Sequence, residues 1–355
     1  MLASGTMASM RLFHRDAPPD RQATAIAGFW SWWAEQGRHA ATAAIADREP
    51  ERVTEDLSRA VGAIDEGLSW ELSAGTTSEH LLVVSPEGNP DLRPLAYRWL
   101  RSAPPADAVW AYAAARQPAP DPESVVLGIG DAQVSFGDVR LGARREGTHV
   151  DVVVHHPAFP SLEEGVRRQV AFLALDTALG EDDVEAWVGE IEVSVDPPLE
   201  AFSLRGLRAV VRDLREEHTG DDGSPSWVLL EADGADGPVL AAAQVPLSPV
   251  TAPHLDTHVA VLVPYLDQTE RGYPGPGSLE ALRALEDHLA DRIGGSGRIV
   301  AHQSHRGMRV LHIYVDSTTP AVEQMRAAVN AWDQGRIRVQ VTSDPGWHHV
   351  AHLRG

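Results

Sequence analysis

The chain of 355 residues carries 30 basic and 51 acidic residues, which gives a formal net charge of −21. A surface this acidic repels phosphate backbones, so binding to nucleic acid is not expected. The chain has no cysteine and every basic residue is an arginine, which excludes thiolate nucleophiles, cysteine-based metal centres and any reaction that needs an active-site lysine.

The beginning of the chain differs from the rest. Residues 1–10 are small and polar and lack the apolar core of a signal peptide, so we interpret them as an addition at the start. Residues 11–21 are charged and contain proline, which predicts a loose arm. No apolar run reaches the roughly 18 residues that a membrane-spanning helix needs. We therefore expect a cytoplasmic protein that does not enter a membrane.

The length favours two domains, here 22–197 and 198–355, with Pro197-Pro198 as the boundary. The first helix is expected to begin at the capping residue Thr24 and to end at Gly37. Its apolar face carries side chains at helical spacing: Ile26, Phe29, Trp30 and Trp33. We expect this face to anchor the helix in the core, with an exposed aromatic patch for a partner as the alternative.

The remaining elements of the first domain follow from turn residues and apolar spacing. Helices are predicted at 51–64, 91–102 and 162–179, the last ended by Gly180, and strands at 69–74, 80–85, 109–116, 134–141, 150–155 and 184–195.

The second domain opens with a helix at 204–217 and two strands at 227–232 and 239–245. The elements that follow are predicted at 258–265, 279–293, 299–303, 308–315, 320–333 and 337–342. Their order is β-α-β-β-α-β, which is typical of ferredoxin-like domains. The predicted fold class is α+β, with two domains built on ferredoxin-like βαββαβ-type sandwiches with antiparallel sheets.

Negative charge gathers in the middle of the chain, where residues 163–234 hold 18 acids and 6 arginines. This region is either a solvated face or a docking surface for a basic protein partner. The candidate binding residues are acids near and beyond Gly180: Glu181, Asp182, Asp183, Glu185 and Glu190. Acids just after a helix end oppose the helix dipole, which slightly strengthens the case for a functional role, although a solvated loop remains the favoured interpretation.

The 16 histidines invite a metal-site interpretation. They fall in four groups: His155-His156, His254 with His258, His302 with His305, and His348-His349 with His352. Adjacent histidines on a strand point to opposite faces and cannot share an ion, and no His-Glu-x-x-His motif occurs. We therefore expect neither a metal site nor a cofactor.

Three short motifs suggest a family: Phe29-Trp30-Ser31-Trp32-Trp33, Leu179-Gly180-Glu181-Asp182-Asp183 and Asp344-Pro345-Gly346-Trp347. On these motifs the chain resembles, over roughly 25–350, bacterial proteins that carry the uncharacterised domain DUF695, although Asp182 stands where the family pattern has tyrosine. The resemblance implies an α+β fold and no established reaction. At the level of fold the chain is also similar to the ribonuclease E regulator B group of small inhibitory proteins.

Two functions remain open. The first is a non-enzymatic protein-binding or regulatory role, inhibitor- or immunity-like, that uses the acidic central surface. The second is a hydrolase or other enzyme that uses carboxylates and histidines in a cleft between the domains. We also predict that Trp347 is at least half buried and closes the C-terminal sheet by packing against helix 320–333 near Trp332.

Overall fold

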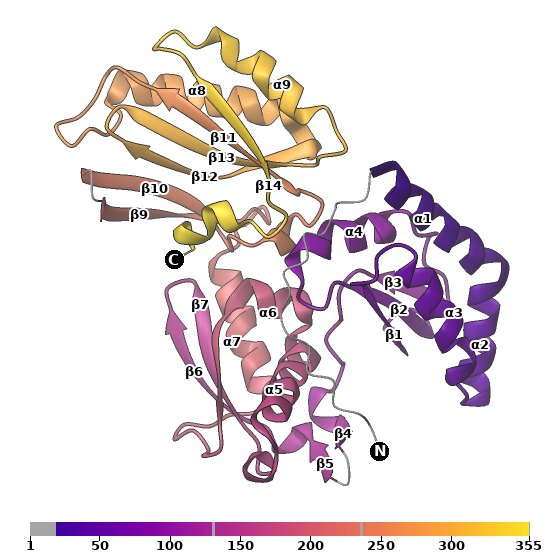
Figure 1. The fold of residues 1–355 in the computed structure, drawn as a ribbon. Coiled ribbons are helices and arrows are strands. Elements are labelled where there is room, and N and C mark those ends of the chain that lie inside the picture. Colours follow the sequence, from indigo (N-terminus) through magenta and orange to yellow (C-terminus); the bar gives the residue numbers. More distant parts are fainter. Residues whose placement is uncertain (1–18, 130–131, 235–236, 355) are drawn as a thin grey trace. The chain divides into compact units, whose positions relative to one another are not determined.

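The structure, a computed structural model, describes residues 19–129, 132–234 and 237–354 (Figure 1). This part of the chain is a mixed α+β protein with nine α-helices and several sheets, one of them antiparallel with six strands. The chain divides into two compact units, the first ending at Asp65 and the second beginning at Glu66. Within the described ranges, no helix is both long and apolar enough to cross a membrane.

The first unit is helical. Helix α1 (Pro19–Trp32) continues through a π-helical turn (Trp33–Gly37) into α2 (Arg38–Asp47), and α3 (Glu51–Gly62) follows. The prediction that Gly37 ends the first helix is therefore wrong. A Cβ atom on Gly37 would lie 2.7 Å from the Trp32 ring, so the glycine admits this ring rather than stopping the helix.

The expected arm falls largely outside the described residues, as do residues 1–10. Its last three residues, 19–21, are helical and belong to α1, so the prediction of a loose arm is wrong for them.

The aromatic stripe of α1 is mostly core, as predicted. Ile26, Phe29 and Trp33 are buried, with Trp33 only 1% exposed, whereas Trp30 is partly exposed. The rings of Phe29 and Trp33 stack with centroids 6.3 Å apart, and Trp30 meets Phe29 edge-on at 5.1 Å.

The second unit opens with a three-stranded sheet of order β1-β2-β3, formed by β1 (Ser69–Ala74), β2 (His80–Ser85) and β3 (Trp110–Ala113). Strands β2 and β3 are parallel and are joined through α4 (Arg93–Arg101). Trp99 of α4 and Trp110 of β3 are fully buried.

A short hairpin and another three-stranded sheet follow. The hairpin is β4 (Val126–Ile129) with β5 (Ala132–Ser135), and the sheet has the order β6-β7-β8, from β6 (Arg140–Glu146), β7 (His149–His155) and β8 (Val188–Ser194). The single strand predicted at 134–141 is thus two, because a 3₁₀ turn at Phe136–Asp138 separates β5 from β6.

Three helices pack with this sheet: α5 (Glu164–Leu179), α6 (Glu181–Trp187) and α7 (Leu204–Glu217). Helix α6 occupies residues that were predicted as a loop and the start of a strand, so that prediction is wrong. The four buried side chains of α7 belong to the same apolar cluster as those of β6, β7 and α5.

The last part of the chain forms the six-stranded antiparallel sheet. Its elements are β9 (Ser226–Gly234), β10 (Gly237–Val245), β11 (Thr257–Pro264), α8 (Pro276–Ile293), β12 (Gly297–His305), β13 (Met308–Val315), α9 (Ala321–Ala328) and β14 (Arg338–Ser343). The strand order is β14-β11-β13-β12-β10-β9. Figure 1 shows α8 and α9 together on one face of this sheet, where they share a core with β11 and β13.

The opposite face of the sheet is also covered. Trp347 is 0% exposed, which confirms its predicted burial, but it stacks on Tyr314 with ring centroids 4.4 Å apart. Trp332 belongs to the core on the helix-covered face, so the predicted contact with helix 320–333 is wrong. Side chains alternate along β13, which places Ile313 towards the helices and Tyr314 on the face that the C-terminal turn (His348–Leu353) covers.

Candidate functional site

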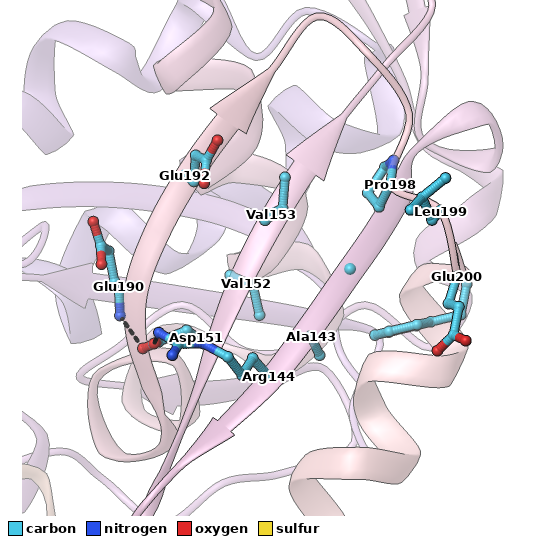
Figure 2. Close-up of a pocket in the computed structure, with 12 residues that line it drawn as sticks. Ala143, Arg144, Asp151, Val152, Val153, Glu190, Glu192, Pro198, Leu199 and Glu200 are labelled. Atoms are coloured by element: carbon cyan, nitrogen blue, oxygen red, sulfur yellow. Dashed lines mark hydrogen bonds and ion pairs between the residues drawn. The ribbon is translucent and has the colours of Figure 1, made fainter.

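A groove of about 620 Å³ lies on the outer face of the β6-β7-β8 sheet (Figure 2). Strand alternation creates its floor, because Leu141 of β6 and Val150 and Val154 of β7 are buried in the core beneath the helices. The residues between them, together with neighbours on β8, line the groove: Gly142, Arg144, Asp151, Val153, Glu190 and Glu192.

Residues 198–202 form one wall of the groove. Phe202 pairs with Leu141 through two reciprocal backbone hydrogen bonds of 2.9 and 3.0 Å, which hold this segment along β6. A Cβ atom on Gly142 would lie 3.0 Å from Cβ of Pro198, so the glycine lets the wall approach the floor closely. Leu199, at the rim, is fully exposed.

Asp151 organises the floor of the groove. Its Oδ1 accepts a hydrogen bond of 2.8 Å from the backbone N–H of Glu190, and its Oδ2 accepts one of 2.8 Å from Arg144 Nη2. A Cβ atom on Gly189 would lie 2.5 Å from Asp151 Oδ1, so glycine allows this contact. The contact lies where the β7–β8 register shifts between Val150 and Val152.

The charges of the groove do not balance. Arg144 is the only cation among its lining residues, and its guanidinium is already paired with Asp151. The other lining acids are Glu190, Glu192 and Glu200. Their carboxylates form no ion pair or hydrogen bond with any other residue of the described ranges. The groove therefore carries uncompensated negative charge that favours the binding of a cation.

Of the five candidate acids named from the sequence, only Glu190 lies in this groove. The other four form hydrogen bonds or ion pairs with other residues of the protein. Glu181 is buried, and its carboxylate accepts hydrogen bonds from Ser85 Oγ at 2.5 Å, from the Gly88 N–H at 3.0 Å and from the Arg116 N–H at 3.2 Å. It thereby ties the start of α6 to the segments that follow β2 and β3.

The next acids pair with arginines. Arg93 of α4, only 3% exposed, binds Asp182 at 2.7 Å and also binds Glu185. Burial raises the pKa of both carboxyls, and the Arg93 charge opposes this rise. Asp183 pairs with Arg215 of α7. The acids at 181–183 form the first turn of a new helix, where the dipole favours negative charge. The unfavourable position after a helix end that the sequence suggested is therefore not what the structure shows.

Gly180 makes the junction between the two helices possible. Its φ of +83° is unfavourable for other residues, and a Cβ atom there would lie 2.9 Å from Cδ of Pro118. Nearby, burial raises the pKa of Asp176 to about 6, despite an ion pair of 3.2 Å with Arg116.

Sequence reasoning missed Arg144, Asp151, Glu192, Glu200 and Leu199 as members of the site. The membership of Glu192 could have been predicted from the sequence, because the alternation Glu190-Ile191-Glu192 places both glutamates on one face of a strand. The wall at 198–202 was not predictable, since it depends on a contact with β6 that no local pattern encodes.

The histidines of the six-stranded sheet form a second cluster. His258 Nε2 lies 3.0 Å from His312 Nδ1, and His349 stacks on His258 at 4.7 Å between ring centroids. Burial lowers the pKa of His258 to about 4 and that of His312 to about 3. Within the described ranges, no group of three or more histidines and acids could hold a metal ion.

Asp344 fixes the C-terminal turn. Its carboxylate accepts hydrogen bonds from Tyr314 OH at 2.6 Å and from the N–H groups of His348 and His349, both at 2.9 Å. Trp347 Nε1 donates to the Leu255 carbonyl at 3.0 Å. Pro345 lies inside this turn, so the Asp344-Pro345-Gly346-Trp347 element has a structural role.

One segment of the chain matches a known family. Residues 241–351 match the model described as "Family of unknown function (DUF695)". This segment contains the Asp344–Trp347 element but neither of the motifs at 29–33 and 179–183, so it is shorter than the resemblance expected from the sequence. No curated protein and no solved structure matches the chain. Residues 241–351 thus form a DUF695 domain.

Proposed function

We propose that this protein is a non-enzymatic binding or regulatory protein, inhibitor- or immunity-like, that holds a basic segment of a partner protein in the groove over β6-β7-β8. The observation that carries the proposal is a set of three lining carboxylates, Glu190, Glu192 and Glu200, that have no partner among the residues that the structure describes. They surround a floor whose one arginine is already neutralised. An arginine or lysine side chain in the groove would supply the missing charge.

The wall of the groove is largely apolar and can contact the aliphatic parts of such a segment. Pro198 and Phe202 line it, and Leu199 stands exposed at the rim. Long basic side chains bury their aliphatic stems along apolar surface while the charged end reaches an acid. The excess of acids over residues 163–234 would also speed the encounter with a basic partner.

An enzyme that combines carboxylates with histidines is the less favoured function. Among the described residues, no histidine lines the groove. The paired histidines His258 and His312 belong instead to the six-stranded sheet, where burial keeps them neutral.

We also propose that the six-stranded sheet contains a ferredoxin-like core. The chain order β11-α8-β12-β13-α9-β14 and the sheet order β14-β11-β13-β12 support a ferredoxin-like core extended by β10 and β9. A distant similarity to the ribonuclease E regulator B group would agree with an inhibitory role, and it rests on fold alone.

The test uses a fluorescent nonapeptide of alternating arginine and leucine, with binding followed by fluorescence anisotropy. Glu190→Gln/Glu192→Gln should weaken binding roughly three- to tenfold, because each exposed charge pair contributes a modest free energy. Added salt should weaken binding to the wild type more than to this variant.

The matched control is Glu280→Gln/Glu323→Gln, which removes the same charge from exposed positions on α8 and α9. This control should bind as the wild type does. Equal affinities for the two double variants would mean that the peptide responds only to net charge, and the groove would lose its proposed role.

A further inference from the structure

Strand β8 is the open edge of the sheet that carries the groove. In the order β6-β7-β8 it pairs with β7 on one side, and no strand of the described ranges pairs with its other side. The opposite edge of the sheet is partly occupied, because Phe202 pairs with Leu141 of β6. An unpaired edge presents backbone donors and acceptors that can hold another strand.

Two hydrogen bonds identify the backbone groups of β8 that face this open edge. The Glu190 N–H donates to the Asp151 carboxylate at 2.8 Å, and the Ser194 carbonyl accepts a hydrogen bond of 3.2 Å from a histidine ring; both partners belong to β7. Backbone groups alternate in direction along a strand. The N–H and C=O groups of Ile191 and Val193 therefore point away from β7, towards the open edge.

The two faces of β8 differ in chemistry. Glu190 and Glu192 are exposed beside the groove (Figure 2), whereas Ile191 and Val193 are partly buried against the core on the helix-covered face. A strand added along β8 would lie about 4.8 Å away. Its side chains would therefore lie next to the two acids on one face and next to the two apolar residues on the other.

We infer that the basic segment of the partner binds as an additional β-strand along β8, an inference that rests on the proposed function. Arginine or lysine at alternate positions faces the groove, and apolar residues between them face the helices. Backbone hydrogen bonds at the edge supply affinity, and the alternate side chains supply specificity.

Charge selects this occupant. Glu190 and Glu192 repel an added strand that carries acids, and they disfavour a second copy of this chain, whose net charge is −21. A strand with basic residues on the groove face neutralises both carboxylates, which have no other partner among the described residues.

The first test compares two peptides of the same composition and charge by fluorescence anisotropy. One is the nonapeptide of alternating arginine and leucine, and the other has all its arginines before all its leucines. Only the alternating peptide can place every arginine on one face of a strand. It should bind roughly tenfold more tightly than the block peptide, because the block peptide cannot satisfy both faces of β8 in one register.

Hydrogen exchange, followed residue by residue by NMR, tests the edge itself. Saturating alternating peptide should slow exchange at the amides of Ile191 and Val193 roughly tenfold or more. The Glu190 amide is the internal control, because it already donates to Asp151, and its exchange should change much less.

The outcomes separate this inference from the proposed function. Peptide binding that depends on Glu190 and Glu192 but leaves the Ile191 and Val193 amides unprotected, or that ignores the order of the residues, would overturn the added strand alone. No binding of the alternating peptide, or binding that Glu190→Gln/Glu192→Gln leaves unchanged, would overturn both.

Discussion

We expect the stability of this protein to fall steeply as the pH decreases from about 6.5 to about 5, because two buried histidines must stay neutral in the folded chain. His258 and His312 are hydrogen-bonded to each other and have folded pKa values of about 4 and about 3. His349 stacks on His258, His352 lies edge-on to His312, and Asp344 is the nearby acid that partly opposes the shift of His258.

The sign follows from the two protonation states. An unfolded histidine titrates near pH 6.5, so below this pH the unfolded chain binds more protons than the folded one and stability decreases. The stabilisation is complete above pH 6.5 and is lost as the pH falls towards the folded pKa. At pH 5, each histidine is about 1.5 pH units below its unfolded pKa and still neutral when folded, which corresponds to about 2 kcal/mol each, or about 4 kcal/mol together.

The assay is urea unfolding at several pH values for the wild type and for His258→Gln/His312→Asn. The two amides can replace the hydrogen bond between Nε2 and Nδ1 but do not titrate. The variant should lose about 4 kcal/mol less than the wild type over this pH range. Asp176, with its pKa raised to about 6, stabilises the fold as the pH falls, equally in both proteins. Equal losses for the two proteins would refute the reasoning.

Three further predictions concern packing. Trp33→Ala should lower the free energy of unfolding by about 3–5 kcal/mol, because Trp33 is only 1% exposed; an unchanged thermal melt would contradict its place in the core. Gly28→Ala, with nothing within 4 Å of the new Cβ, should stabilise by about 0.5–1 kcal/mol, whereas Gly37→Ala should stabilise less or destabilise, because its Cβ would lie 2.7 Å from the Trp32 ring and force the ring to shift; chemical denaturation of the two variants compares them. Removal of residues 344–355 should lower the melting temperature and promote aggregation, since it uncovers one face of the six-stranded sheet; unchanged solubility would show that the turn is dispensable.

Most elements of the second unit could be predicted from the sequence, because turn residues and apolar spacing are local signals. The six elements from β11 to β14 appear in the expected order and close to the expected positions. The two buried faces of their sheet were less predictable. The run Leu311-His312-Ile313-Tyr314 mixes residues of both faces, and only the fold reveals that a tyrosine and a histidine are covered as well.

Elsewhere, tertiary contacts overrode local signals. Gly37 resembles a helix stop, yet a neighbouring tryptophan ring determines its role. The acids after Gly180 resemble a loop, yet their partners Ser85 and Arg93 lie far away in the chain. The groove was foreseen only through Glu190, since residues distant in the sequence build its floor and its wall.

The ion pairs of the buried Arg93 side chain have a consequence for related sequences. One guanidinium, 3% exposed, serves two carboxylates, Asp182 and Glu185, from a helix about ninety positions away. A neutral residue at position 93 would leave two acids repelling each other beside the core, and loss of both acids would leave a buried cation without a counter-ion. Substitutions at these three positions should therefore be inherited together, so that a change at one of them is a marker for compensating changes at the others.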